Sequence, residues 1–170
     1  MVSRLRNFAS FQVGWFSCVL GAANHRPWLG PIVVLALLTA HLWNREDRWE
    51  ELRLILAVGL LGFLVDSLLG YAGILVFRDS VITEWLCPPW LLALWLNFAT
   101  VLRNSLGWLV RRYSLAAPLG GIFGPVSYYA GQEFGALRLG VSLPVVATVL
   151  SVLWALLVPL LLWWGADERE

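Results

Sequence analysis

Long apolar stretches, separated by short polar or proline-containing segments, run through almost the whole chain. A helix needs about 20 mainly apolar residues to cross the hydrocarbon core of a bilayer. By that criterion the pattern predicts six membrane-spanning helices with short connections and no room for a soluble domain. The sequence therefore predicts an all-α fold, with residues 1–170 forming a single transmembrane domain. The predicted spans cover residues 7–23, 29–43, 52–77, 89–110, 115–137 and 139–164.

The fifth predicted span is the least apolar, because glycine and proline residues interrupt it. These residues are Gly120, Gly121, Gly124, Pro125, Gly131 and Gly135. If this segment only dips into the bilayer, the chain crosses five times and its C-terminus lies on the opposite side. The segment 44–51, which precedes the third span, carries six charges and is typical of an aqueous loop.

The basic residues indicate which ends of the helices face the cytoplasm. The chain has no lysine, so all twelve basic residues are arginines. With the N-terminus inside, eight arginines fall in inner segments and three in outer loops, which favours an N-in, C-in topology by the positive-inside rule. The inner ones are Arg4, Arg6, Arg45, Arg48, Arg53, Arg111, Arg112 and Arg169, and the outer ones are Arg26, Arg78 and Arg138. The tryptophans support the same span ends. Eight of the eleven lie at a predicted end, and indole rings prefer the headgroup level of a bilayer.

Asp66 is the strongest candidate for a functional residue. It lies near the centre of the third predicted span, where a carboxyl group costs a few kcal/mol and usually marks a site or a proton relay. Gly59, Gly62, Gly70 and Gly73 share its helical face, and small residues let another helix approach closely. We therefore expect Asp66 to face protein rather than lipid, as a proton-donating or anchoring group and the one candidate catalytic residue.

Polar residues on the next two spans are candidate partners of Asp66. In the fifth span, Ser127 shares a face with Gly120, Gly124, Gly131 and Gly135, which predicts close packing of the third, fourth and fifth spans. Helical rise places Asp66, Asn97 and Tyr128 all at roughly 20 Å from the predicted inner ends. Their convergence is a hypothesis, and ordinary interhelical hydrogen bonding is the alternative for the neutral groups taken singly. The candidate ligand-binding residues are Asn97, Asn104, Ser127, Tyr128 and Arg103.

Arg103 lies about 120° away from the face that carries Asn97 and Asn104. It is about 10 Å from the predicted inner interface, so snorkelling to inner phosphates, or contact with a lipid headgroup, is the favoured interpretation. Pairing with Gln12 or Asp66 is the alternative.

Several classes of function are disfavoured by composition and motifs. Hydrophobic residues make up 59% and charged residues 14%, and a soluble domain would need more polar surface. With two histidines and no clustered carboxylates, we expect no metal, and no motif indicates a nucleotide or another cofactor. A net charge of +1 gives no reason to expect a nucleic-acid partner.

Several motifs suggest a family. They are FQVGWF at 11–16, CVLGAA at 18–23, PWLG at 27–30, VDS at 65–67, the stretch 89–108, and GPVSYYAG at 124–131. Together they resemble a family of small bacterial inner-membrane proteins catalogued as domain of unknown function 2878. The family pattern has an Asn-His pair where Arg103-Asn104 stands here, which argues against a histidine-based role at that position. The resemblance implies a multi-pass protein of the bacterial inner membrane without an established activity. A loose association of such proteins with fatty-acid-modifying genes favours a lipid-related role.

Three functions are consistent with these features. The first is binding, modifying or moving a lipid-like molecule at a polar midplane pocket around Asp66. The second is a small proton-coupled transporter in which Asp66 titrates. The third is a non-catalytic subunit or scaffold whose glycine faces bind another membrane protein or a second copy of the chain. Membrane lipids are expected partners in each case, and whether any reaction is catalysed stays open.

Overall fold

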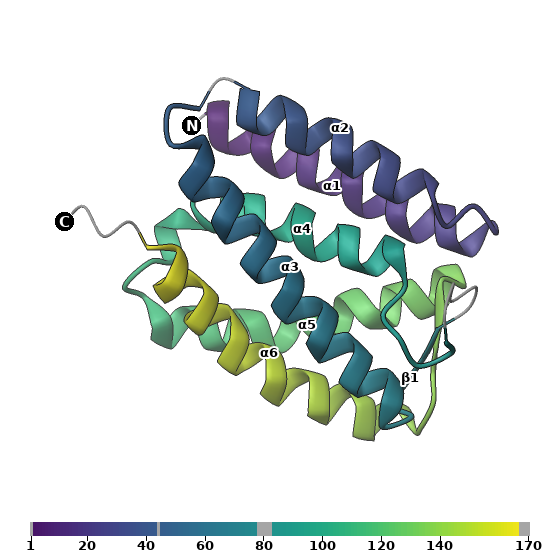
Figure 1. Cartoon of the computed structure of the whole chain (residues 1–170). Coiled ribbons are helices and arrows are strands. Elements are labelled where there is room, and N and C mark those ends of the chain that lie inside the picture. Colours follow the sequence, from purple (N-terminus) through teal and green to yellow (C-terminus); the bar gives the residue numbers. More distant parts are fainter. Residues whose placement is uncertain (1, 44, 78–82, 167–170) are drawn as a thin grey trace.

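A computed structural model describes residues 2–43, 45–77 and 83–166, with side chains from residue 4 onward. This part of the chain forms six α-helices that run in alternating directions (Figure 1). The all-α prediction is therefore confirmed. The helices are α1 (Val2–Ala23), α2 (Leu29–Trp43), α3 (Arg48–Tyr71), α4 (Pro89–Leu102), α5 (Tyr113–Phe134) and α6 (Leu143–Gly165).

Helix α4 is the centre of the bundle. It packs against α1, α2 and α3, whereas α5 and α6 pack mainly against each other on the other side of the molecule (Figure 1). Because the helices alternate in direction, α1 begins and α6 ends at the same end of the bundle, called the first end below. The connections from α1 to α2, from α3 to α4 and from α5 to α6 lie at the opposite, second end.

A short antiparallel ribbon closes the second end. Strand β1 (Leu75–Phe77) pairs with β2 (Leu137–Leu139), so that the connections after α3 and after α5 are joined. Gly135 ends α5 with a φ of 87°, and Gly73 follows α3 with a φ of 69°, a conformation that favours glycine. The predicted third span included β1, and the predicted fifth and sixth spans included the two ends of β2, so these three spans were wrong at those ends. Both strands are apolar enough to continue a hydropathy pattern although the backbone has left the helix.

The fourth helix is also shorter than predicted. It ends at Leu102 rather than Val110, and turns lead to a 3₁₀ helix at Gly107–Leu109. Asn104, Ser105 and Gly107 favour turns over helix interiors, which explains the early end.

Two helices, α3 and α6, are long and apolar enough to cross a membrane, which suggests a membrane protein. Helices α2 and α4 are apolar as well but span only 15 and 14 residues. Six helices are therefore present in the described part of the chain, and two of them have the length and composition of a span.

The glycine faces pack in a different arrangement from the predicted one. Gly59 and Gly62 of α3 lie against α4, as expected for the third and fourth spans. Gly120 and Gly124 of α5 instead lie against α6, where Trp154 covers Gly124. The prediction that the fifth span packs through its glycines against the third and fourth was therefore wrong. Helices that follow each other through a short connection are usually neighbours in space, and α6 occupies that face of α5.

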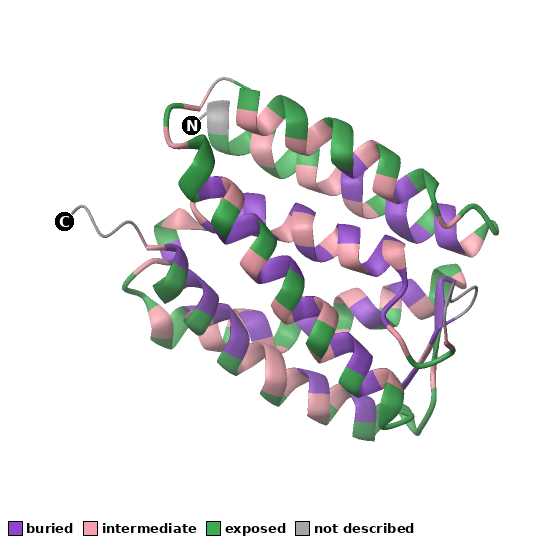
Figure 2. Cartoon of the chain, in the orientation of Figure 1, coloured by how far each residue is buried: buried purple, intermediate pink, exposed green. Residues whose placement is uncertain are grey.

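Large apolar side chains are exposed on the outward faces of several helices (Figure 2). They include Leu35 on α2, Leu60 and Leu68 on α3, Phe123 on α5 and Leu156 on α6. Exposed tryptophans lie towards both ends, with Trp28 and Trp85 at the second and Trp43, Trp49, Trp108, Trp163 and Trp164 at the first. Trp90, at the start of α4, also lies at the second end but is buried.

Candidate functional site

Asp66 lies at the point where three helices meet. Its side chain is fully buried, and each carboxyl oxygen accepts one short hydrogen bond. The Tyr128 hydroxyl of α5 donates to Oδ1 at 2.6 Å, and the Trp95 indole of α4 donates to Oδ2 at 2.6 Å. The expectation that Asp66 faces protein is confirmed, and so is its convergence with Tyr128. The neighbouring Gly62 allows this, because its missing side chain leaves room for the Trp95 ring.

An aromatic cluster lies beside the carboxyl group. Trp95 stacks on Trp154 of α6, with ring centroids 5.0 Å apart and planes inclined by 11°. Phe98 contacts both rings edge-on, and the Tyr128 ring approaches Trp154 at 6.4 Å. The carboxyl group, its two hydrogen-bond donors and these rings form one continuous packing unit that links α3, α4, α5 and α6.

A cavity of about 810 Å³ lies on the other side of this cluster. Its walls come from α1, α4 and α5, with Trp154 and Val158 contributed by α6. Aromatic residues dominate the lining, and no charged side chain takes part among the described residues. The aromatic lining residues are Phe8, Phe11, Trp15, Phe16, Trp90, Trp95, Phe98, Trp108, Phe123, Tyr128, Phe134 and Trp154. Asp66 itself does not line the cavity and reaches it only through Tyr128 and Trp95.

Two of the five candidate ligand-binding residues line this cavity. Tyr128 does so beside its bond to Asp66, and Ser127 does so while its hydroxyl accepts a hydrogen bond from the Trp15 indole at 3.1 Å. A volume of this size suits a drug-sized or single-chain lipid molecule. The lining has the usual character of such sites, which are mainly apolar and carry a few polar groups.

The other three candidates lie elsewhere. Asn97 donates to the Phe11 carbonyl of α1 at 2.9 Å. It follows Trp95 by two residues, which is about 200° around the helix, so it lies on the opposite side of α4 from the indole that contacts Asp66. Asn104 donates to the Thr100 carbonyl at 2.7 Å, one turn earlier in the chain. These bonds fasten α4 to α1 and close the end of α4.

Arg103 belongs to a polar cluster around the buried Glu51 at the first end, which the sequence interpretation missed. Its Nε donates to the Gly165 carbonyl at 2.8 Å, and its Nη1 lies 3.6 Å from Oε2 of Glu51. Glu51 is fully buried. Its Oε1 lies 2.8 Å from Nε2 of His41, and its Oε2 lies 3.5 Å from Nη2 of Arg45.

Placing all of segment 44–51 in an aqueous loop was therefore wrong for Glu51, which lies in the first turn of α3. The sequence did contain a signal that Glu51 is buried. Glu51 falls on the same helical face as Gly59, Gly62 and Asp66. In the adjacent loop, the Arg45 guanidinium donates to both oxygens of Asp47 at 2.9 and 2.7 Å and holds the pKa of that carboxyl below its usual value.

Trp95 is a functional residue that the sequence interpretation did not single out, since it donates a hydrogen bond to Asp66. A tryptophan deep in an apolar segment needs a partner for its N–H, and that requirement is the signal that could have identified it. Within the described ranges, no three His, Cys, Asp or Glu side chains are grouped as metal ligands would be.

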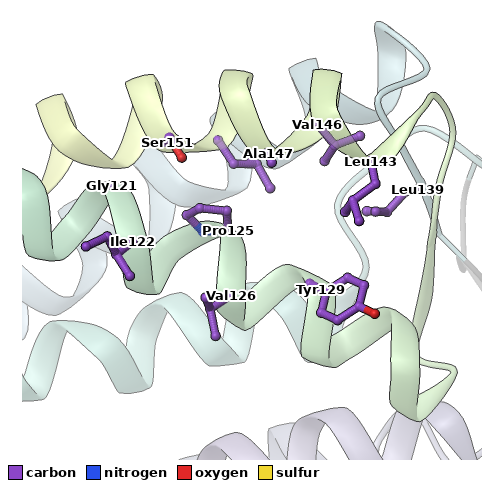
Figure 3. A pocket seen from close by; sticks show the side chains of 11 residues that line it. Gly121, Ile122, Pro125, Val126, Tyr129, Leu139, Leu143, Val146, Ala147 and Ser151 are labelled. Carbon is purple, nitrogen blue, oxygen red and sulfur yellow. The ribbon is translucent and has the colours of Figure 1, made fainter.

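A second, shallower hollow of about 370 Å³ lies between α5 and α6 (Figure 3). Pro125 and Tyr129 from α5 lie across it from Val146 and Ala147 of α6. Its lining is almost entirely apolar and contains no group of the Asp66 unit, so it is the weaker candidate for a specific site.

A family model described as "Protein of unknown function (DUF2878)" matches residues 4–160 of the chain. The match includes every motif on which the resemblance was based. No curated protein and no solved structure matches the chain.

Proposed function

The chain belongs to the DUF2878 family, and we propose that it is a multi-pass membrane protein that binds a lipid-like molecule in the aromatic cavity. The cavity carries this proposal, because a volume of about 810 Å³, lined by aromatic rings and by no charged side chain of the described residues, suits an apolar guest. Tyr128 and Ser127 would contact the guest. Asp66 would act as a positioning residue that holds Tyr128 and Trp95 in place.

The membrane part of the proposal rests on the surface. Exposed Leu, Ile, Val and Phe side chains cover the outward faces of the helices, whereas soluble proteins rarely expose large contiguous apolar patches. Exposed tryptophans at both ends fit the two interfacial belts of a bilayer protein. We infer six crossings of a bacterial inner membrane with both termini inside. The short α2 and α4 would require tilted neighbours or a locally thinner bilayer.

Substituted-cysteine labelling tests this topology. The native Cys18 and Cys87 are 0% and 4% exposed, so they give a low background with a maleimide. In intact cells Trp28→Cys should react with a membrane-impermeant maleimide, and Trp43→Cys should react only after the membrane is opened. Equal reaction of both in intact cells would contradict the topology.

The binding function is tested by filling the cavity. Gly131 of α5 lines it, and a Cβ at this position would meet only the Leu137 side chain, at 3.6 Å, which is ordinary contact. Gly131→Phe should therefore insert a ring without a backbone clash. Ile122→Phe is the matched control, because Ile122 is 57% exposed on the same helix and outside this cavity.

The measurement is comparative lipidomics of the envelope, together with extraction of the purified protein. Deleting the gene should change a lipid species, and restoring the wild type or Ile122→Phe should reverse the change. Gly131→Phe should fail to restore it and should purify without the bound molecule. An unchanged lipid profile and an empty wild-type protein would refute the proposal.

The scaffold function gains no support from the glycine faces. Gly59 and Gly62 are covered by α4, while Gly120 and Gly124 are covered by α6. A partner helix or a second copy of the chain would have to bind through another surface.

A further inference from the structure

Gln12 of α1 lies in the wall of the aromatic cavity, and its carboxamide has no hydrogen-bond partner among the described residues. The helix directs this side chain towards the cavity, since Phe8, Trp15 and Phe16 also line it and lie three or four residues away. Arg103, the partner considered from the sequence, is engaged in the cluster at the first end instead. The carboxamide can therefore bind a guest, with Oε1 as an acceptor and Nε2 as a donor.

Other polar side chains of the wall have partners within the protein. The Trp15 indole donates to Ser127, the Ser105 hydroxyl donates to Oδ1 of Asn7, and Tyr128 and Trp95 donate to Asp66. Gln12 is the only Asn or Gln among the described residues of the lining. It is the group best placed to fix the head of a bound molecule, because such cavities orient their ligands through a few polar groups.

Gln12 also lies near the middle of its helix. Because α1 runs from Val2 to Ala23, helical rise places Gln12 about 15 Å from either end. In the proposed membrane arrangement that depth is the hydrocarbon core, where water is scarce and an unpaired amide is unfavourable. A guest that both accepts and donates hydrogen bonds at this depth would remove that cost.

Access and charge restrict the guest to uncharged molecules with an apolar chain. The cavity opens between α1 and α5, since Phe8 and Phe123 line it and are 50% and 64% exposed. In a bilayer this opening faces acyl chains, so a single apolar chain can enter sideways. No Arg, His, Asp or Glu lines the cavity within the described part of the chain. An ionised head group inside it would lose its hydration without gaining a charged partner, which is strongly unfavourable.

We propose that the cavity takes an uncharged single-chain lipid whose head group presents an acceptor and a donor side by side to Gln12, as a primary carboxamide does. The carbonyl oxygen of the guest would accept a hydrogen bond from Nε2 of Gln12, and its N–H would donate one to Oε1. The apolar chain would lie against the aromatic wall. This proposal rests on the proposed binding function and specifies the chemical class of its ligand.

Equilibrium binding to the purified full-length protein in detergent, measured by scintillation proximity with tritiated oleamide, tests the class. The unlabelled competitors have similar chains but different head groups. Oleamide both donates and accepts, methyl oleate only accepts, 1-octadecene does neither, and oleyl sulfate is charged. Oleamide should compete at least threefold better than methyl oleate, since one added hydrogen bond changes affinity by roughly two- to tenfold. Oleyl sulfate should compete more weakly than oleamide.

Gln12→Met assigns the preference to the amide, because methionine is unbranched and of similar length but lacks the amide. The readout is the ratio of oleamide affinity to 1-octadecene affinity, in which the partitioning of each molecule into detergent is the same for every variant. This ratio should fall at least threefold in Gln12→Met. Affinity for 1-octadecene should not fall, which shows that the cavity of the variant is intact. Ser10→Met is the control and should keep the wild-type ratio, because Ser10 is exposed on the same helix and lies outside the cavity.

The possible outcomes separate the two proposals. Equal competition by oleamide and methyl oleate, tighter binding of oleyl sulfate, or an unchanged affinity ratio in Gln12→Met would overturn the inference while leaving the binding function intact. Failure of both tritiated oleamide and tritiated 1-octadecene to bind the wild type would count against the binding function itself.

Discussion

Replacing Asp66 by two side chains of similar size tests how the central unit is held together. Asp66→Leu removes both acceptors and leaves the Tyr128 hydroxyl and the Trp95 indole buried without partners. Asp66→Asn keeps one carbonyl oxygen for the indole and offers an amide N–H to Tyr128, whose hydroxyl oxygen can accept it. Leucine should therefore destabilise the protein much more than asparagine does.

The magnitude follows from the two bonds. Interhelical hydrogen bonds in membrane proteins contribute about 0.6 kcal/mol on average and up to about 1.7 kcal/mol, so losing two costs about 1–3.5 kcal/mol. Because both donors also become unmet inside the protein, we expect the upper part of that range for leucine, about 2–3.5 kcal/mol. For asparagine we expect less than about 1 kcal/mol, since both bonds can be remade.

Cysteine reactivity offers a direct assay of unfolding. Cys18 and Cys87 are buried, so a maleimide should label them only as the protein unfolds with rising denaturant. Glu133→Leu is the control, because this exposed acid lies near the end of α5 and its removal should change the free energy of unfolding by less than about 0.5 kcal/mol. Equal losses for leucine and asparagine, or no loss for leucine, would refute the proposed hydrogen-bond geometry.

Two further substitutions test other parts of the bundle in the same unfolding assay. Gly124→Leu would place a side chain in the space filled by Trp154, so it should destabilise the α5–α6 pair by about 1–3 kcal/mol or prevent folding, and normal stability would contradict that packing. Glu51→Leu should cost about 1–3 kcal/mol, because the partly exposed Arg103 and His41 lose the buried carboxylate that they contact, whereas the exposed Glu84→Leu should be near neutral.

The helices of this fold were largely predictable from the sequence. The bounds of α2 agree with the predicted 29–43, and α1 ends at residue 23 as predicted. The errors lie where apolar residues leave the helix, as at Leu75–Phe77, because hydropathy measures burial and not backbone conformation. Which helices become neighbours was less predictable, since glycine spacing marks a packing face but does not name its partner.

The candidate site was predictable only in part, because the sequence gives the depth of a residue along its helix but not the direction in which it points. Depth along a helix placed Asp66 and Tyr128 at one level, and they meet. Asn97 lies at a similar depth but points to α1, because depth carries no information about rotation. The cavity has no single sequence signal, since it is the space that three helices and the rings upon them leave between one another.

The position of Asp66 bears on the choice between ligand binding and proton-coupled transport. A transporter needs its intramembrane acid to exchange protons with each side in turn. Here Asp66 is fully buried behind Trp95 and Tyr128, so transport requires a second conformation in which both bonds are broken. At about 1–3.5 kcal/mol that conformation is accessible, so its cost alone does not decide between the functions.

Asp66→Asn does decide between them, because it preserves the packing unit and removes the titrating group. A binding protein in which Asp66 only positions Tyr128 should keep its ligand affinity within about threefold in this variant, whereas a proton-coupled transporter should lose its pH-dependent flux in proteoliposomes. Tyr128→Phe gives the complementary result, since it removes the hydroxyl that lines the cavity and should weaken binding of an oxygen-bearing ligand by about two- to tenfold. Full ligand affinity in Asp66→Asn, together with the absence of flux in the wild type at any pH, would favour the binding function.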